Sequence, residues 1–124
     1  IGNTSAASML LARLGGLVVA DVTGAGTGLD ADAVLRKIEV LRAVLALHAG
    51  ARTPLQALAA FGGFEIATMV GAVQQAAAER RVIVVDGFIA SAAVLVASKL
   101  EPAVHFPYTK PLRQDLSQVR LESK

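Results

Sequence analysis

Cysteine and tryptophan are absent from this chain of 124 residues, and aromatic residues make up only 4% of it. Without cysteine there is no disulfide framework, no thiolate ligand for zinc and no thiol nucleophile. The few aromatic residues, set against many alanines and valines, favour close helix–helix and helix–sheet packing over an all-β fold. The length suffices for one compact domain with a hydrophobic core.

Long hydrophobic runs are also lacking, although 54% of the residues are hydrophobic. No run reaches the roughly 18 residues that span a bilayer. The longest candidate, residues 88–98, lies between Asp86 and Lys99. No basic segment precedes an apolar one in the manner of a signal peptide. The sequence therefore predicts a cytoplasmic protein with no membrane partner.

An excess of one charge is confined to the last residues of the sequence. The net charge is +2, and residues 107–124 alone hold four basic and two acidic residues, which leaves eight of each sign in residues 1–106. No basic stretch is interleaved with aromatic residues, so nucleic acid is a poor candidate partner. We interpret residues 1–106 as part of an α/β domain and residues 107–124, with two prolines and weak periodicity, as a divergent basic tail.

Helical patterns fill most of residues 1–106. Asp30 has the character of a helix cap and is followed by apolar residues on one face of a helix. Thr53 and Pro54 have the composition of a helix start, and Thr4 or Ser5 can cap the first helix. Helices are therefore expected over about 4–14, 31–49, 54–61, 64–80 and 89–100.

One segment has the pattern of a buried strand. Residues 82–85 are four consecutive β-formers, apolar on both faces, as expected at the centre of a parallel sheet. Residues 17–22 and 103–106 are shorter candidates, and the order of elements indicates an α/β fold. In such sheets ligands bind beyond the carboxyl ends of the strands, which makes Asp86 a candidate site residue. The alternative for Asp86 is a simple cap of the next helix.

Residues 24–30, with the sequence GAGTGLD, carry the strongest local signal. Three glycines at alternate positions leave bare backbone N–H groups before a helix start, an arrangement that suits an anion. Neither a P-loop nor a dinucleotide fingerprint is present, because no GK[ST] follows and the third glycine of GxGxxG is missing. A glycine-rich turn with a cap at Asp30 explains the same residues equally well.

Lys37 favours the anion site. It lies seven residues after Asp30, about 10 Å along the helix, and side chains lean back toward the helix start. A lysine at the edge of an apolar stripe either snorkels to solvent or serves an anion. Glu65 also has two explanations, a first-turn acid facing the helix dipole or a site residue. His48 and His105 lack partners at metal-ligand spacing, so no metal site is assigned.

Four segments, in order, resemble the nicotinate-nucleotide–dimethylbenzimidazole phosphoribosyltransferase family. They are IGNTSAAS, GAGTGLDADAVLRKIEVLRAVLALH, PLQALAAFGGFEIATMVGAV and VIVVDGFIASAAVLVA, and the likeness runs from Ile1 to about His105. The resemblance implies an α/β fold with a Rossmann-like parallel sheet, a smaller helical domain and a homodimer. It also implies that the chain is a helix-rich, central piece of the family's domain.

The resemblance implies a reaction in cobalamin biosynthesis. A benzimidazole ring nitrogen attacks the ribose anomeric carbon of nicotinate mononucleotide, nicotinate leaves and α-ribazole phosphate forms. The implied substrates are nicotinate mononucleotide and dimethylbenzimidazole, with no metal and no organic cofactor. The residues that match the family's phosphate- and ribose-binding positions are Gly2, Asn3, Thr4, Ser5, Gly26, Thr27, Gly28 and Lys37.

The acidic residues that the family uses in catalysis have no counterpart in these 124 residues. In the family a Glu-Met-Gly segment directly precedes the stretch that matches IGNTSAA, and a Gly-Glu-Gly-Thr-Gly loop carries the expected general base. We therefore expect this chain to supply the phosphate-binding part and to be inactive alone, with Asp86 and Glu65 as weak substitutes for the base. The alternative hypothesis is a non-catalytic remnant or an oligomerisation module of the same fold.

Overall fold

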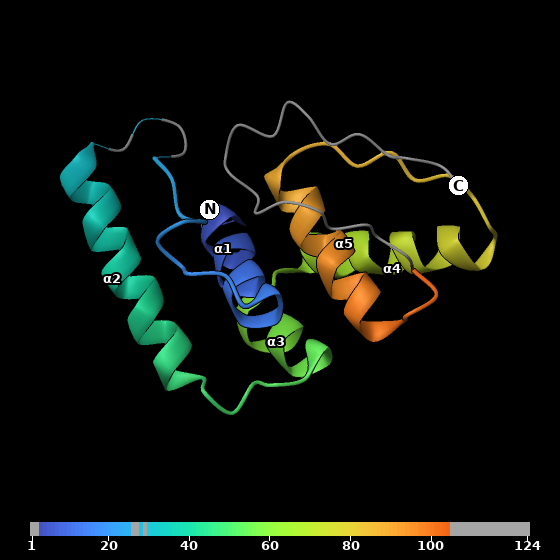
Figure 1. The fold of residues 1–124 in the computed structure, drawn as a ribbon, viewed down its shortest axis with the longest axis horizontal. Coiled ribbons are helices and arrows are strands. Elements are labelled where there is room, and N and C mark those ends of the chain that lie inside the picture. Colours follow the sequence, from blue (N-terminus) through green and yellow to red (C-terminus); the bar gives the residue numbers. More distant parts are fainter. Residues whose placement is uncertain (1–2, 26–27, 29, 105–124) are drawn as a thin grey trace.

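The computed structural model describes residues 3–25, 28 and 30–104, and all regular structure within these residues is helical (Figure 1). The expected helix-rich character is therefore confirmed. In chain order the helices are α1 (Asn3–Gly15), α2 (Ala31–Leu47), α3 (Pro54–Phe61), α4 (Phe64–Ala78) and α5 (Phe88–Leu100).

The ends of the helices follow local sequence signals in most cases. Asp30 caps α2, since its side chain accepts a hydrogen bond from the Ala33 backbone N–H at 2.7 Å. Thr53 caps α3 in a reciprocal capping box with Gln56, and Pro54 is the first helical residue. The predicted caps of these two helices are confirmed.

Two expected helix ends were wrong. The first helix begins at Asn3, so Thr4 and Ser5 lie inside its first turn rather than capping it. The second helix ends at Leu47, three residues before Gly50, and His48 is its C-cap. The α2 helix ends before Gly50 because the backbone N–H of His48 already donates to the carbonyls of Val44 and Ala46.

The core is built around α5. Residues 91–97 of this helix are all buried, and α5 packs against α1, α3 and α4. Its small side chains, among them Ala92, Ala93 and Ala97, allow close approach of the surrounding helices. Leu10 and Leu11 of α1, both fully buried, face two adjoining parts of this core.

Helix α2 lies to one side of the bundle in Figure 1, next to α1. Ile38 and Leu41 bury its inner face against Val19. A lateral position of this kind leaves the opposite face of α2 in solvent, and Leu35, Val40 and Leu47 are among the exposed apolar residues.

The segment predicted as a central strand has no strand structure in the described part of the chain. Ile83 and Val85 are half-buried against the core, whereas Val82 and Val84 are 87% and 83% exposed. The alternation is that of a strand, but no backbone hydrogen bond joins residues 82–86 to other described residues. A strand exists only when paired, so the predicted sheet stays unconfirmed.

The two shorter strand candidates also differ from expectation. Residues 17–22 contain a turn, in which the Asp21 backbone N–H donates to the Val18 carbonyl at 2.9 Å. At the other candidate, Ala103 lies in a turn and Val104 in a bend, while residues 105 and 106 lie outside the described residues. Glycines flank the first stretch and prolines the second, and local turn bonds replace sheet pairing in the described residues of both.

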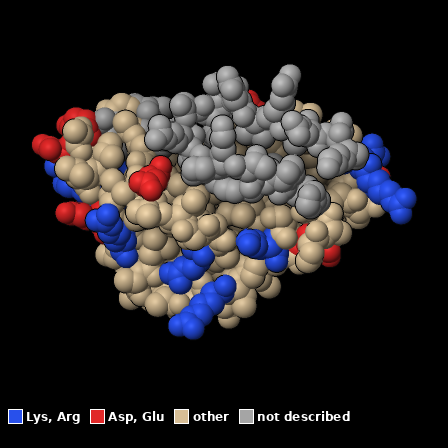
Figure 2. Space-filling model, viewed as in Figure 1, with Lys and Arg blue, Asp and Glu red and all other residues tan. Residues whose placement is uncertain are grey.

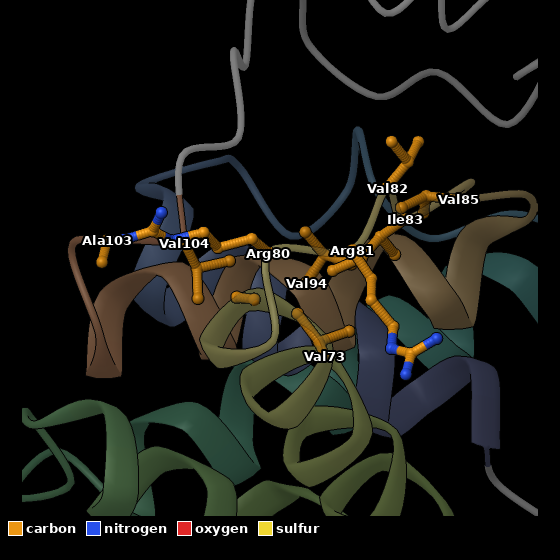
Figure 3. A pocket seen from close by; sticks show the side chains of 10 residues that line it. Val73, Arg80, Arg81, Val82, Ile83, Val85, Val94, Ala103 and Val104 are labelled. Carbon is orange, nitrogen blue, oxygen red and sulfur yellow. The ribbon is translucent and has the colours of Figure 1, made fainter.

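A shallow hollow of about 370 Å³ lies between α4, α5 and the segment 80–85. Figure 3 shows Val73, Val94 and Val104 gathered along it, whereas Val82 points away from them. Apart from Arg80 and Arg81, every lining residue is apolar. A hollow lined in this way offers packing surface and holds no carboxylate or imidazole for catalysis.

Candidate active site

The start of α1 presents two polar side chains and open backbone donors. Asn3 and Thr4 are the first two residues of the helix. The first four N–H groups of a helix have no partner within it, and the helix dipole adds partial positive charge at this end. This end of α1 is therefore suited to hold a negatively charged group, provided that other residues complete the site.

Lys37 of α2 reaches the start of α1. Its Nζ donates a hydrogen bond to Thr4 Oγ1 at 3.2 Å, across 33 positions of sequence. In Figure 1 both α1 and α2 begin in the upper half of the picture and run downward. Since the Thr4 hydroxyl accepts from Lys37, its own hydrogen is free to be donated to a further acceptor.

Glu65, in the first turn of α4, reaches the same helix start from another side. Asn3 Nδ2 donates to Glu65 Oε1 at 2.6 Å. The carboxylate lies over Gly63, where an added Cβ would overlap both of its oxygens. The Glu65 backbone N–H and, second, the Asn3 amide lower the pKa of this carboxyl. Glu65 is consequently ionised near neutral pH.

Two side-chain hydrogen bonds made by the adjacent residues Asn3 and Thr4 thus bring together four residues from three helices, which we call the polar row: Glu65, Asn3, Thr4 and Lys37. Its two ends carry opposite charges, and its two middle residues are neutral hydrogen-bonding groups. Lys37 and Thr4, two of the residues that the family resemblance assigns to phosphate and ribose binding, are in contact in this geometry. The binding of phosphate there stays a prediction.

Other predicted site residues are only partly placed. Ser5 lies half-buried in the same helical turn as Thr4, and Gly28 is exposed with φ 119°, a value that favours glycine. Gly2, Gly26 and Thr27 lie outside the described residues. That the glycine loop completes the polar row therefore stays a prediction.

Asp86 does not belong to the polar row. It is exposed, and no hydrogen bond links it to that row within the described part of the chain. The cap interpretation was also wrong, since Gly87, with φ 88°, occupies the N-cap of α5 and no side chain caps that helix. Only glycine adopts this φ readily, which explains why the neighbouring aspartate is displaced from the capping position.

A comparison of the sequence with known families decides the identity. The sequence model of the family described as "Phosphoribosyltransferase" matches residues 1–108, most of the chain. The chain belongs to this phosphoribosyltransferase family. The resemblance inferred from the four sequence segments is therefore confirmed.

The relatives of this chain carry a more specific name. Over 104 residues it is 73% identical to the nicotinate-nucleotide–dimethylbenzimidazole phosphoribosyltransferase of Variovorax paradoxus (strain S110) and 62% identical to that of Cupriavidus necator. In both cases the match covers 84% of this chain and 30% of the relative. The chain thus spans about a third of the length of these relatives.

The fold of this chain is shared with part of a solved structure. The crystal structure of CobT from Thermus thermophilus superposes with a TM-score of 0.77 at 35% identity. The match covers 84% of this chain and 31% of that one. The arrangement of α1–α5 is therefore that of the corresponding part of a family member.

The rest of the described surface was searched for charged patches, metal ligands and membrane-spanning helices. On the face shown in Figure 2, basic side chains are spread apart with broad uncharged areas between them. No group of three His, Cys, Asp or Glu residues that could hold a metal ion occurs in residues 3–25, 28 and 30–104. No helix in those ranges is both long enough and apolar enough to cross a membrane.

The contact between Asn3 and Glu65 was not predicted from the sequence. The two residues are 62 positions apart, and no local pattern connects them. Glu65 follows a glycine pair at a helix start. This sequence signal left two explanations open, an acid that faces the helix dipole or a site residue. Only the packing of α4 near the start of α1 shows which neighbour it has.

Proposed function

We propose that this chain forms the nucleotide-phosphate-binding part of an enzyme that transfers phosphoribose from nicotinate mononucleotide to dimethylbenzimidazole. The names of the relatives supply the two substrates. In this reaction the benzimidazole nitrogen bonds to the ribose anomeric carbon while the bond to nicotinate breaks. The products are α-ribazole phosphate, nicotinate and the proton lost from the benzimidazole.

The observation that carries the proposal is the hydrogen bond from Lys37 Nζ to Thr4 Oγ1 at 3.2 Å. It unites a cation from α2, a hydroxyl from α1 and the open N–H groups at the start of α1. A phosphate beside Thr4 would meet an ammonium, a hydroxyl donor and the positive end of a helix dipole. All three favour a phosphate dianion over a neutral ligand.

The family resemblance extends the proposal to the whole enzyme. The Rossmann-like sheet, in which residues 82–85 are a strand, the homodimer and the cytoplasmic location are parts of this proposal. The base that accepts the benzimidazole proton is unassigned, and this chain alone is expected to be inactive. Holding a base in place typically contributes 10²–10⁴-fold to a rate, so phosphate binding alone does not give useful turnover.

The substitution Lys37→Ala tests the phosphate site. A hydrogen bond to a charged group is worth roughly 1.5–3 kcal/mol, so binding of nicotinate mononucleotide should weaken by at least about tenfold. Isothermal titration of the wild-type and variant chains measures this change. Lys99→Ala is the matched control, because Lys99 lies exposed in the last turn of α5. Equal affinity of the Lys37→Ala and wild-type chains would remove Lys37 from the site.

A non-catalytic or oligomerisation module is the second candidate function. It is favoured by the exposed apolar side chains, above all Phe64 at 93% exposure on α4. A wild-type chain that self-associates but binds no nicotinate mononucleotide in the same titration would support this candidate over the phosphate site.

A further inference from the structure

Glu65 has a position that phosphate binding does not explain. Its ionised carboxylate accepts a hydrogen bond from Asn3, and the Lys37 ammonium donates one to Thr4, the next residue of α1. A carboxylate in contact with a phosphate would repel it. If phosphate lies at the Lys37 end, the Glu65 end must face a part of the ligand that donates hydrogen bonds.

A ribose phosphate has its functional groups in the matching order. The phosphate is attached at the 5-position, and the 2- and 3-hydroxyls are neighbouring donors on the far side of the sugar ring. Each oxygen of a carboxylate has two lone pairs, so Glu65 keeps acceptor sites open while Oε1 accepts from Asn3. Acidic side chains bind ribose hydroxyls in this way in dinucleotide-binding folds.

We propose that the Glu65 carboxylate accepts hydrogen bonds from the ribose hydroxyls and so makes the site selective for ribose phosphates over deoxyribose phosphates. This inference rests on the proposed function, since it requires phosphate at the Lys37 end of the polar row. Asn3 acts as a positioning residue, because its 2.6 Å hydrogen bond to Oε1 orients the Glu65 carboxylate.

The surroundings of Glu65 favour this role over that of a general base. Backbone and Asn3 hydrogen bonds lower its pKa, whereas an efficient base has a pKa near the working pH. Gly63 leaves the space in which the carboxylate lies, since any Cβ there would overlap it. The backbone at Gly63 has φ −110°, which alanine also adopts. Glycine at this position therefore provides space rather than an unusual backbone conformation.

The test compares three ligands on the full chain: ribose 5-phosphate, 2-deoxyribose 5-phosphate and inorganic phosphate. Dissociation constants are measured by NMR titration for the wild-type chain and for Glu65→Ala, Glu65→Gln and Gly63→Ala. We expect the wild-type chain to prefer ribose over deoxyribose by about fivefold or more. In Glu65→Ala the ratio of the dissociation constants for 2-deoxyribose 5-phosphate and ribose 5-phosphate falls to about one. The affinity for inorganic phosphate is unchanged or higher, because a negative charge has been removed.

Two further variants separate a local role from a general loss of structure. Gly63→Ala moves the carboxylate without removing it, and should reduce the preference. Gly71→Ala is its control on the same helix, because a Cβ at Gly71 meets nothing within 4 Å, and it should retain the full preference. Glu65→Gln keeps the shape and one acceptor oxygen, and is expected to show an intermediate preference.

The outcomes distinguish this inference from the proposed function. If Glu65→Ala and Gly63→Ala keep the wild-type preference while Lys37→Ala loses phosphate affinity, the role of Glu65 is wrong and the phosphate site stands. If the wild-type chain binds none of the three ligands, or if Lys37→Ala binds inorganic phosphate as tightly as the wild type does, both proposals are wrong.

Discussion

At the scale of single residues, Asn3 and Thr4 are adjacent in sequence but their side chains serve different helices. Asn3 donates to Glu65 of α4, and Thr4 accepts from Lys37 of α2. One helical turn thereby links three helices through two side-chain hydrogen bonds. Both bonds are exposed to solvent, so their contribution to stability is small, and their main effect is on the positions of the charged groups.

The substitution Asn3→Ala tests this effect on Glu65. Loss of the Asn3 amide should raise the pKa of Glu65, because the ionised form loses a donor, while the bond from its own backbone N–H keeps the pKa below the ordinary value. Carbon-13 NMR titration of the carboxyl groups measures the shift. Glu79 is an internal control, since Gln75 and Arg81 lower its pKa and neither contacts Asn3. Identical Glu65 titrations in both chains would contradict the prediction.

The same pKa shift fixes the pH dependence of the Asn3–Glu65 link. Because the pKa of Glu65 is lowered in the folded chain, the link stabilises the fold above the ordinary glutamate pKa. Its contribution is lost as the pH falls through the lowered value. The Asn3–Glu65 link is therefore present throughout the neutral range.

Local residue signals were predictable from the sequence, whereas contacts between distant residues were not. The side chains of Asp30 and Thr53 each accept a hydrogen bond from the backbone N–H three residues later. Such caps can be predicted from the residue types around the helix start. Side-chain geometry predicted only that Lys37 leans toward the start of its own helix, α2. Its actual partner Thr4, and the Asn3–Glu65 pair, depend on helix packing that no local pattern encodes.

At the scale of elements, α2 is attached to the bundle near both of its ends. Lys37 bonds to Thr4 two turns after the start of α2, and Arg13 of α1 bonds to carbonyls near its end. The Arg13 Nη2 atom donates to Leu45 O at 2.6 Å and Nη1 to Ala49 O at 3.2 Å. The same guanidinium lies 5.4 Å from the ring centre of Phe61 in α3. Arg13 therefore joins α1, α2 and α3.

The substitution Arg13→Lys should loosen the end of α2. Lysine keeps the charge but lacks the planar fork that bonds two carbonyls and stacks on an aromatic ring. We expect the free energy of unfolding to fall by roughly 1–2 kcal/mol. Amide hydrogen exchange over residues 44–50, measured by mass spectrometry, should become faster. Arg42→Lys, on the exposed face of α2, is the matched control. Unchanged exchange in Arg13→Lys would show that apolar packing alone holds α2.

The segment 82–85 shows the limit of element prediction. A strand buried on both faces was predicted, whereas Val82 and Val84 are exposed, Ile83 and Val85 are half-buried, and the backbone has no partner among the described residues. A helix satisfies its hydrogen bonds within one segment, whereas a strand requires a second one. The pattern therefore predicts the capacity to form a strand, and a neighbouring strand decides whether it forms.

At the scale of the whole molecule, the exposed apolar residues are as informative as the core. The most exposed are Phe64 (93%), Val82 (87%), Val84 (83%) and Leu47 (80%). Two of the four belong to the segment whose backbone is also unpaired. Unpaired, apolar, extended backbone is a template for pairing with another chain. The surface around residues 82–85 is thus the part of this molecule most prone to association.

We predict that the purified chain self-associates through this segment. Val84→Lys should weaken the association by about tenfold or more, because burying a valine is worth roughly 1.5 kcal/mol or more and an edge lysine opposes pairing. The stability of the monomer should change little, since the Val84 side chain is already 83% exposed. Sedimentation velocity over a concentration series measures the effect, with Val18→Lys as control at a second exposed valine outside the helices. A wild-type chain that remains monomeric and unfolds sharply at a concentration-independent temperature would refute the prediction, and an equal effect of Val18→Lys would assign the association to another surface.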